Sequence, residues 1–408
     1  MQVKRLFQMA LMVSALTMVG CAVNPVTGQR ELGLVSGAQE ISLGEENYGP
    51  MQQMEGGVYQ IDEALTAYVS EVGQRVAAHA DRDLPYEFVV LNNSVPNAWA
   101  LPGGKMAINR GLLTEMDSEA ELAAVLGHEV VHAAARHGAQ RMERGLLLQG
   151  AAAAVGIAAS DSDYAPLVVG SALVGAQLLN QRYSRHAELE ADRYGTLYMH
   201  RAGYNPEAAV SLQETFVRLS EGRQQDWLSG LFASHPPSTE RVRANRQLAD
   251  ELGRDGEWGR ERYQRMIAGL KESKPAYEAY EEGRKALAEG NHAKALQQAD
   301  KALGMLPREA MFQGLRGDAL QAAGRKGDAL RAYDRAIQLN PDYFYFPLRR
   351  GLMHREASRF DQAERDLKRS VEMLPTQVAY RGLGDIAKSR GQTEQAQRYY
   401  QMAGDGAQ

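Results

Sequence analysis

The sequence predicts a protein in two parts, an α+β domain with a small β-sheet followed by an all-α solenoid of helical repeats. Three observations support this fold class. Short β-prone runs lie between residues 86 and 109, a strongly helical segment begins at Ser118, and small residues recur with a 34-residue period after residue 274. A chain of 408 residues is also too long for one ordinary domain.

Composition narrows the classes of function. Hydrophobic residues make up 44% of the chain, which is enough for a sizeable core. The formal net charge is only -5, with both signs interspersed, whereas a nucleic-acid-binding protein needs a basic face. We therefore expect no nucleic acid among the partners.

The first 20 residues predict export from the bacterial cytoplasm. Lys4 and Arg5 precede a mostly apolar stretch, residues 6–19, that is too short to span a bilayer comfortably. This layout is typical of a bacterial export signal, so we assign residues 1–20 to a signal peptide of the lipoprotein type. The alternative is an uncleaved N-terminal anchor.

Cys21 is the predicted lipidation site. The run Met18-Val19-Gly20-Cys21 resembles a lipobox, in which the cysteine is lipidated and becomes the mature N-terminus. It is the only cysteine, so no disulfide can form within the chain, and lipidation explains a lone thiol in an exported protein. Ala22 resembles the residue that follows the cysteine in lipoproteins of the outer membrane. We therefore expect a periplasmic protein anchored to the outer membrane through Cys21.

Residues 21–270 are predicted to form the α+β domain. Residues 61–80 carry apolar side chains at the spacing of one helix face. Residues 86–91 form a β-prone run, and residues 105–109 can return as a second strand after a turn rich in Pro, Gly and Asn. A small sheet should therefore precede the helix that begins at Ser118.

The helix that begins at Ser118 is strongly specified. Glu121 lies three residues on and completes a capping box, and we expect the helix to continue to about His137, just before Gly138. Two apolar stretches follow it, residues 146–159 and 165–179. We interpret them as a pair of closely packed helices, with a membrane-touching hairpin near the site as the alternative.

This helix carries the motif His128-Glu129-Val130-Val131-His132. The two histidines lie four residues apart, so both imidazoles project from one face and can hold one metal ion. Glu129 lies beside the open position of such a metal, where it can take a proton from water. The alternative is a pair of structural core histidines, which is costly because polar groups buried in an apolar helix need partners.

A catalytic zinc site needs a third protein ligand, and a later helix, expected from Arg182 to about Ala202, supplies one. Glu188 and Asp192 lie four residues apart on one face, beside the small Ala191 that permits close helix approach. We assign Glu188 as the third ligand of a single Zn²⁺. Asp192 is expected to support catalysis by orienting one of the imidazoles.

Three other polar residues of these helices are expected at the surface. Glu190 points about 200° away from Glu188 on a helix of 3.6 residues per turn. His137 falls on the face opposite His128, and His186 is turned away from Glu188. We therefore predict that Glu190 faces solvent and that both histidines are ordinary surface residues.

Residues 274–407 are predicted to form a repeat array. Positions that recur every 34 residues are Gly283, Gly317 and Gly351, then Ala295, Ala329 and Ala363, then Pro307, Pro341 and Pro375. A fourth unit is one residue shorter. The period resembles the tetratricopeptide repeat, in which small residues let two antiparallel helices pack closely and the units form a concave surface for peptides or proteins. The alternative is a stabilising appendage without a ligand.

Four segments of the chain together resemble one protein family. They are HEVVH at 128–132, the ExxAD pattern at 188–192, NAWALPGG at 97–104 and SHPP at 234–237. They resemble the HtpX and CAAX-prenyl-endopeptidase family of gluzincin metallopeptidases and, given the export signal and the repeats, BepA-type periplasmic proteases most of all. The likeness covers nearly the whole mature chain, and the motifs occur in the family's order. One departure is Trp99, where the family more often has Phe.

The resemblance implies a zincin-like (gluzincin) metallopeptidase domain with zinc held by His128, His132 and Glu188, and with Glu129 as the general base. It also implies a role in quality control of outer-membrane proteins. The predicted partners are therefore unfolded or misassembled outer-membrane proteins, together with the outer-membrane assembly machinery.

The segment Asn97-Ala98-Trp99-Ala100 is the predicted substrate-binding element. With Leu101 it would form an edge strand beside the cleft and pair with the backbone of the substrate by strand addition, a mode that suits broad specificity. A plain hairpin with a Gly-Gly turn is the alternative.

His235 is the remaining catalytic candidate. Two prolines follow it, which hold the chain extended and fix the direction of the imidazole. We expect His235 to approach the zinc, either blocking the water position in a resting state or stabilising the oxyanion in the working state. Arg241, on the helix after Pro237, is a further candidate for stabilising charge in the transition state.

These features predict a periplasmic zinc metalloendopeptidase that acts on misfolded or stalled envelope proteins. The alternative function is a chaperone or assembly adaptor whose peptidase is normally latent. A third possibility, a zinc-dependent hydrolase of a non-peptide substrate, is disfavoured by the strand-presenting segment.

Overall fold

The computed structural model describes residues 21–145, 182–221 and 225–404. The predicted export signal and the apolar stretches 146–159 and 165–179 lie outside the described residues. None of the helices described there combines the length and the apolar character that a membrane crossing requires.

The described chain begins with a hairpin. Strand β1 (Cys21–Val23) pairs antiparallel with β2 (Arg30–Leu32). The turn between them is closed by Asn24, whose Oδ1 accepts hydrogen bonds from the backbone N–H groups of Val26 and Thr27. Gly28 completes it with a positive φ of 73°. Sequence periodicity did not reveal this hairpin because its strands are only three residues long.

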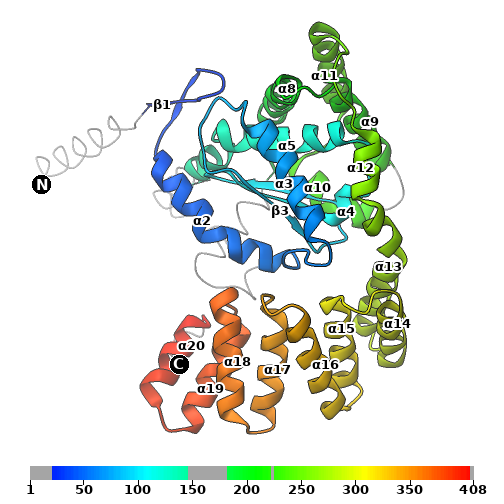
Figure 1. Ribbon diagram of the computed structural model, residues 1–408. Coiled ribbons are helices and arrows are strands. Elements are labelled where there is room, and N and C mark those ends of the chain that lie inside the picture. The colour runs from blue at the N-terminus through cyan, green and yellow to red at the C-terminus, as the bar shows by residue number, and fades with distance from the viewer. Residues whose placement is uncertain (1–20, 146–181, 222–224, 405–408) are drawn as a thin grey trace, which may run out of the picture.

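A three-stranded sheet lies between two helical layers (Figure 1). Strands β3 (Glu87–Leu91), β4 (Ala98–Leu101) and β5 (Lys105–Asn109) follow the order β3-β5-β4, so β4 is an edge strand. Helix α2 (Gly37–Met54) covers one face through Met51, which packs with Trp99. Helices α3 (Glu63–Ala77) and α5 (Glu119–Ala134) cover the other face, where Ile108 joins the main core.

Helix α5 begins as predicted and ends earlier than predicted. Ser118 and Glu121 form the complete capping box. The prediction that the helix continues to His137 is wrong, because Arg136 adopts a left-handed φ of 61° and a new helical segment starts at residue 137. Such a backbone costs about 1–2 kcal/mol in a non-glycine residue. Hydrogen bonds from Arg136 to the buried Glu40 (2.6 Å) and to the carbonyl of Val35 (2.6 Å) offset that cost.

Helix α8 (Arg185–Arg201) packs closely against α5. At the crossing, a Cβ added to Gly127 would lie 2.9 Å from the carbonyl oxygen of Gly195. The two helices can therefore approach only because both positions are glycine, and this approach brings their polar faces together. The remaining elements of this domain are α4 (Arg110–Leu113), α9 (Glu207–Glu221), α10 (Gln225–Ser234), α11 (Thr239–Leu252) and α12 (Arg260–Met266).

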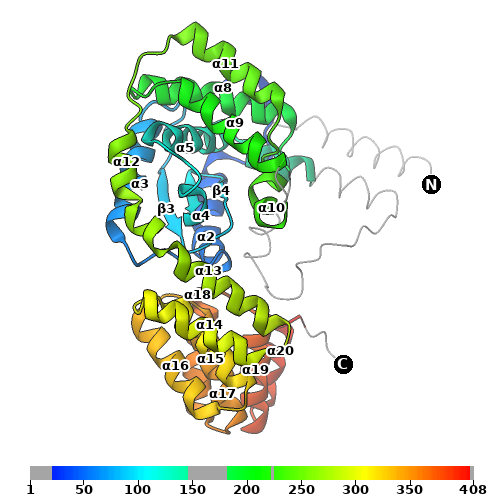
Figure 2. The ribbon, with the colours of Figure 1, turned by 90° about the vertical axis from the view of Figure 1, so that its right-hand side faces the viewer.

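The second part of the chain is an all-α array, so the predicted fold class is confirmed. Its successive helices are α13 (Ala268–Ala288), α14 (His292–Met305), α15 (Ala310–Ala322), α16 (Lys326–Leu339), α17 (Tyr345–Glu356), α18 (Phe360–Met373), α19 (Gln377–Ser389) and α20 (Thr393–Met402). Figure 2 shows them as stacked helix pairs beneath the first domain. Helix α13 runs without interruption from the first domain into the array.

Replacing Gly317 by Ala is expected to destabilise the array by about 1–3 kcal/mol, because an added Cβ would lie 2.7 Å from the ring of Tyr333 in a packed helix pair. Gly327→Ala is the matched control, since nothing lies within 4 Å of its Cβ position. Chemical denaturation of both variants measures the difference. Equal stabilities would contradict close helix packing as the reason for glycine at position 317.

The array docks on the first domain through buried polar contacts. Glu309, at the start of α15, accepts hydrogen bonds from Asn92 at the end of β3 and from the hydroxyl of Tyr277 on α13. The guanidinium of Arg110 lies 3.3 Å from the centre of the Tyr277 ring. An exposed hydrogen bond adds to these contacts, from Gln53 on α2 to the carbonyl of Asp342 between α16 and α17. The two parts therefore meet along a shared polar interface.

Candidate metal centre

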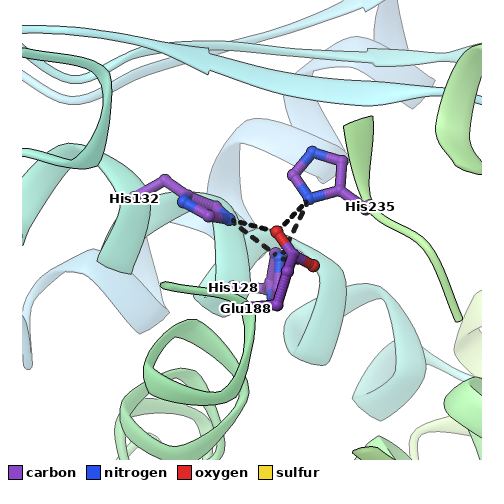
Figure 3. A group of neighbouring side chains, drawn as sticks. All are labelled: His128, His132, Glu188 and His235. Atoms are coloured by element: carbon purple, nitrogen blue, oxygen red, sulfur yellow. Dashed lines mark hydrogen bonds and ion pairs between the residues drawn. The ribbon is translucent and has the colours of Figure 1, made fainter. Parts of the chain in front are cut away.

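Four side chains from three segments converge at the α5–α8 crossing. His128 and His132 come from α5, Glu188 comes from α8, and His235 follows directly after α10 (Figure 3). One donor atom from each lies within 4.8 Å of all the others, and all four residues are buried. This is the one such group of histidine, cysteine and carboxylate side chains in the part of the chain that the structure describes.

Hydrogen-bond partners at the Nδ1 atoms of His128 and His132 fix the orientation of the two α5 imidazoles. The Nδ1 of His128 lies 3.0 Å from Asp192 Oδ1, a carboxylate that can only accept a hydrogen bond. The Nδ1 of His132 lies 2.9 Å from the Nδ1 of His137. The two Nε2 atoms face each other at 3.0 Å. Two lone pairs at that distance repel each other, so the contact requires a proton or a metal cation between them.

The spacing of the donor atoms fits zinc. Tetrahedral zinc with bonds of about 2.0–2.1 Å places its ligand atoms roughly 3.3–3.4 Å apart. His235 Nδ1 lies 3.3 Å from His128 Nε2 and 3.0 Å from Glu188 Oε1. Glu188 Oε1 in turn lies 3.4 Å from His132 Nε2. Two imidazoles, one carboxylate and a fourth nitrogen are also the donor types that zinc prefers.

Electrostatics reinforce this reading. Burial raises the pKa of Glu188, but His235, His128 and Arg241 together bring that pKa well below its ordinary value, so the carboxylate stays ionised. Burial lowers the pKa of His128, yet Glu188 and Asp192 raise it to about 10. The ionised Glu188 carboxylate therefore supplies negative charge that can offset a bound cation.

Glu129 lies beside the cluster without joining it. Its Oε1 is 3.7 Å from Nε2 of His235, and its Oε2 is buried without a hydrogen-bond partner among the described residues. Burial raises the pKa of the Glu129 carboxyl, while His235 and His128 oppose the rise. A buried carboxylate with a raised pKa and a free oxygen is suited to accept a proton.

Asp192 is held by Arg241 while it contacts His128. The guanidinium of Arg241 donates to both Asp192 oxygens, at 2.6 and 2.7 Å, and its Nη1 lies 2.8 Å from Glu188 Oε2. Arg241 is itself buried. The guanidinium is thus engaged with two carboxylates of the site, and its predicted role in the transition state stays a prediction.

The predictions that His137 and Glu190 face solvent are wrong. Both are buried, with His137 5% and Glu190 8% exposed. The left-handed turn at Arg136 redirects the chain so that His137 returns to His132, and its Nε2 lies 3.3 Å from Glu190 Oε1. Only His186 is exposed, with 76% of its side chain accessible.

Tyr183 is a site residue that the sequence analysis missed. Its ring stacks on the imidazole of His132 with a centroid distance of 3.8 Å and an interplanar angle of 25°. Burial raises the pKa of its hydroxyl to about 12. No spacing rule could have found it, because it precedes α8 and shares no periodicity with the motif.

Strand β4 is an edge strand, and its outer backbone groups pair with no other strand among the described residues. Asn109 N–H donates to the carbonyl of Asn97 at 2.8 Å, so the alternation of an antiparallel pair directs the polar groups of Trp99 towards β5 and those of Ala98 and Ala100 outwards. The side chain of Trp99 packs against α2. The small side chains of Ala98 and Ala100, and not the Trp99 ring, therefore face the α5 side of the sheet.

Comparisons with known proteins agree with this geometry. Residues 63–249 match peptidase family M48, and residues 280–344 match the tetratricopeptide repeat. The "Metalloprotease YcaL" of Escherichia coli (strain K12) is 32% identical over 186 residues, which cover 42% of this chain and 68% of that protein. The "Mitochondrial metalloendopeptidase OMA1" of Schizosaccharomyces pombe is 33% identical over 222 residues, covering 54% of this chain and 64% of that protein.

A third relative matches on a longer region. The "Beta-barrel assembly-enhancing protease" of Escherichia coli (strain K12) is 27% identical over 235 residues, which cover 56% of this chain and 47% of that protein. The match thus spans about half the length of this relative.

Proposed function

This chain belongs to peptidase family M48 and is a zinc metalloprotease with a tetratricopeptide-repeat array, and we propose that it acts in the bacterial envelope on misfolded or stalled outer-membrane proteins. The family resemblance predicted from the motifs is confirmed. The observation that carries the proposal is the convergence of four donor atoms at zinc spacing beside a buried carboxylate.

We assign the roles at the centre as follows. His128, His132 and Glu188 hold zinc, and bound zinc supplies Lewis-acid chemistry that makes water nucleophilic near neutral pH and polarises a peptide carbonyl. Glu129 takes the proton from the attacking water and passes it to the leaving amine. Asp192, itself fixed by Arg241, keeps the Nδ1 proton of His128 in place so that Nε2 faces the metal.

His235 is assigned to a closed resting state. Its Nδ1 occupies the position of a fourth donor, whereas a working zinc protease keeps that position for water and substrate. Helix α10, which leads into His235, also lies against the start of β4, since a Cβ at Gly230 would be 3.8 Å from the Cβ of Asn97. Opening therefore requires this segment to move away from both the metal and the strand.

His235→Ala is expected to raise the rate of peptide cleavage roughly tenfold or more, as when a minor open state becomes the main one. Zinc content should remain at one per chain, because three ligands are intact. Cleavage of a fluorogenic unfolded protein, with zinc measured in parallel, tests this. A strong loss of cleavage would instead assign His235 to oxyanion stabilisation, and no change in either quantity would reject both roles.

Substrate is proposed to bind along β4. The outward N–H and C=O groups of Ala98 and Ala100 can extend the sheet onto an unfolded segment. Main-chain pairing depends little on the side chains of the substrate, which suits a protease that cleaves many different misfolded proteins. Asn97 and Trp99 direct their backbone groups to β5 and so hold the strand in the sheet, while the Trp99 ring packs on the α2 side.

The envelope location and the substrates rest on two supports. The export signal and the lipobox ending at Cys21 favour an outer-membrane lipoprotein of the periplasm, and the printed name of one relative concerns β-barrel assembly. The array then binds outer-membrane substrates or their assembly machinery. Capture of cross-linked partners on the Glu129→Gln variant in the envelope tests the proposal. Recovery of outer-membrane proteins is expected, and recovery of none contradicts it.

The closed site also favours a second candidate function, an assembly adaptor whose peptidase is normally latent. Complementation of a deletion strain by Glu129→Gln separates the two. Full rescue means that binding by the array dominates, and no rescue means that cleavage is the main activity.

A further inference from the structure

The N-terminal hairpin is connected to the metal centre by a series of buried polar contacts, of which two are hydrogen bonds and one is an ion pair. His132 contacts His137 at 2.9 Å, His137 contacts Glu190 at 3.3 Å, and the Nδ2 of Asn24 donates to the same Glu190 oxygen at 3.0 Å. All of these side chains are less than 10% exposed, and Asn24 is only 1% exposed. These contacts join residues that lie more than 100 positions apart in the sequence.

The chemistry of each side chain fixes which atom donates and which accepts at every contact of this series. His132 must keep its Nε2 free for zinc, so its Nδ1 carries the proton and donates to the Nδ1 of His137. His137 therefore holds its own proton on Nε2, the nitrogen that lies 3.3 Å from the Glu190 carboxylate. Glu190, an ionised acceptor, is fixed from the other side by the amide of Asn24. Every donor meets an acceptor, so one tautomer of His132 is selected.

We propose that Asn24, acting through Glu190 and His137, is a positioning residue for the zinc ligand His132, so that the docked N-terminal hairpin is part of the metal centre. This inference rests on the proposed role of His132. It adds three positioning residues that the motif does not contain, and it links the centre to the element that directly follows Cys21.

Further hydrogen bonds hold the N-terminal hairpin in the position from which Asn24 reaches Glu190. Gln140 donates to Glu31 of β2 at 2.6 Å, and the amide of Asn24 also donates to Glu31 at 3.0 Å. Glu143 accepts from the backbone N–H groups of Leu34 and Val35, both at 3.0 Å. The docking surface is the helical segment that begins at residue 137, the same segment that carries His137.

The test measures zinc affinity of the full chain by competition with a chelator. Asn24→Ser keeps an oxygen for the turn but cannot reach Glu190, and it should weaken zinc binding about 2–10-fold, the worth of one hydrogen bond. His137→Ala should weaken it about 10–100-fold, and His137→Asn, which restores an acceptor for His132, should recover part of the loss. Gln29→Ala, an exposed position of the same turn, is the control.

Coupling separates positioning from general stability. Because Asn24 acts through His137, Asn24→Ser should have no further effect on zinc affinity in the His137→Ala background. Additive losses, or an Asn24→Ser affinity equal to that of Gln29→Ala, would overturn the proposal. Asn24→Ser and His137→Asn carry the test if His137→Ala does not fold. His132→Ala should lose zinc altogether; if it did not, the proposed centre itself would fail.

Discussion

The Glu129→Gln variant is expected to lose about 10²–10⁴-fold in peptide cleavage while keeping one zinc per chain. General-base catalysis contributes an acceleration of that size, and the amide of Gln cannot accept the proton from water. Zinc is retained because the carboxylate of Glu129 is not among the four clustered donors. The buried, unpartnered Oε2 is the atom whose chemistry the substitution removes.

The measurement combines a cleavage assay with metal analysis of the purified protein. Glu240→Gln is the control, because it alters a carboxylate that pairs with the exposed Arg185 and stands outside the centre. Retained cleavage in Glu129→Gln would remove Glu129 from the mechanism. Loss of zinc along with cleavage would show that Glu129 supports the metal and not only the proton transfer.

The central part of the site could be predicted because it obeys helical periodicity. His128 and His132 share a face of α5, and Glu188 and Asp192 share a face of α8, so each pair follows from a spacing of four residues. The meeting of the two helices was suggested by the small Ala191, and Gly127 and Gly195 make the contact even closer. The strands around residues 87–109 and the helical repeats could also be predicted, because each follows from a pattern of residue types within a short stretch of sequence.

The outer part of the site could not be predicted, because it depends on one backbone conformation without a sequence signal. A left-handed residue after a helix is usually glycine, and here it is Arg136. On an uninterrupted helix, His137 would point about 140° away from His132. The turn removes that separation, and Asn24 then reaches Glu190 from a hairpin distant in sequence. Contacts of this kind have no periodicity from which they could be read.

Glu188→Gln is expected to lower zinc affinity by more than the roughly 10–100-fold that follows from removing an outer partner of a ligand. The neutral amide keeps the size of the side chain and an oxygen for Arg241, but it lacks the charge that offsets the cation. Glu188 is 2% exposed, so little solvent can replace that charge. Cleavage should fall with the zinc content. Arg193→Ala, on the exposed side of α8, is the control.

Added zinc distinguishes this defect from the loss of the general base. Excess zinc should partly restore cleavage in Glu188→Gln, because occupancy rises by mass action while Glu129 remains in place. The same addition should do nothing for Glu129→Gln, whose centre is already occupied. If Glu188→Gln bound zinc as tightly as the unmodified chain, the third ligand would have to be another residue. His235, whose Nδ1 already lies 3.3 Å from His128 Nε2, would then be the nearest candidate.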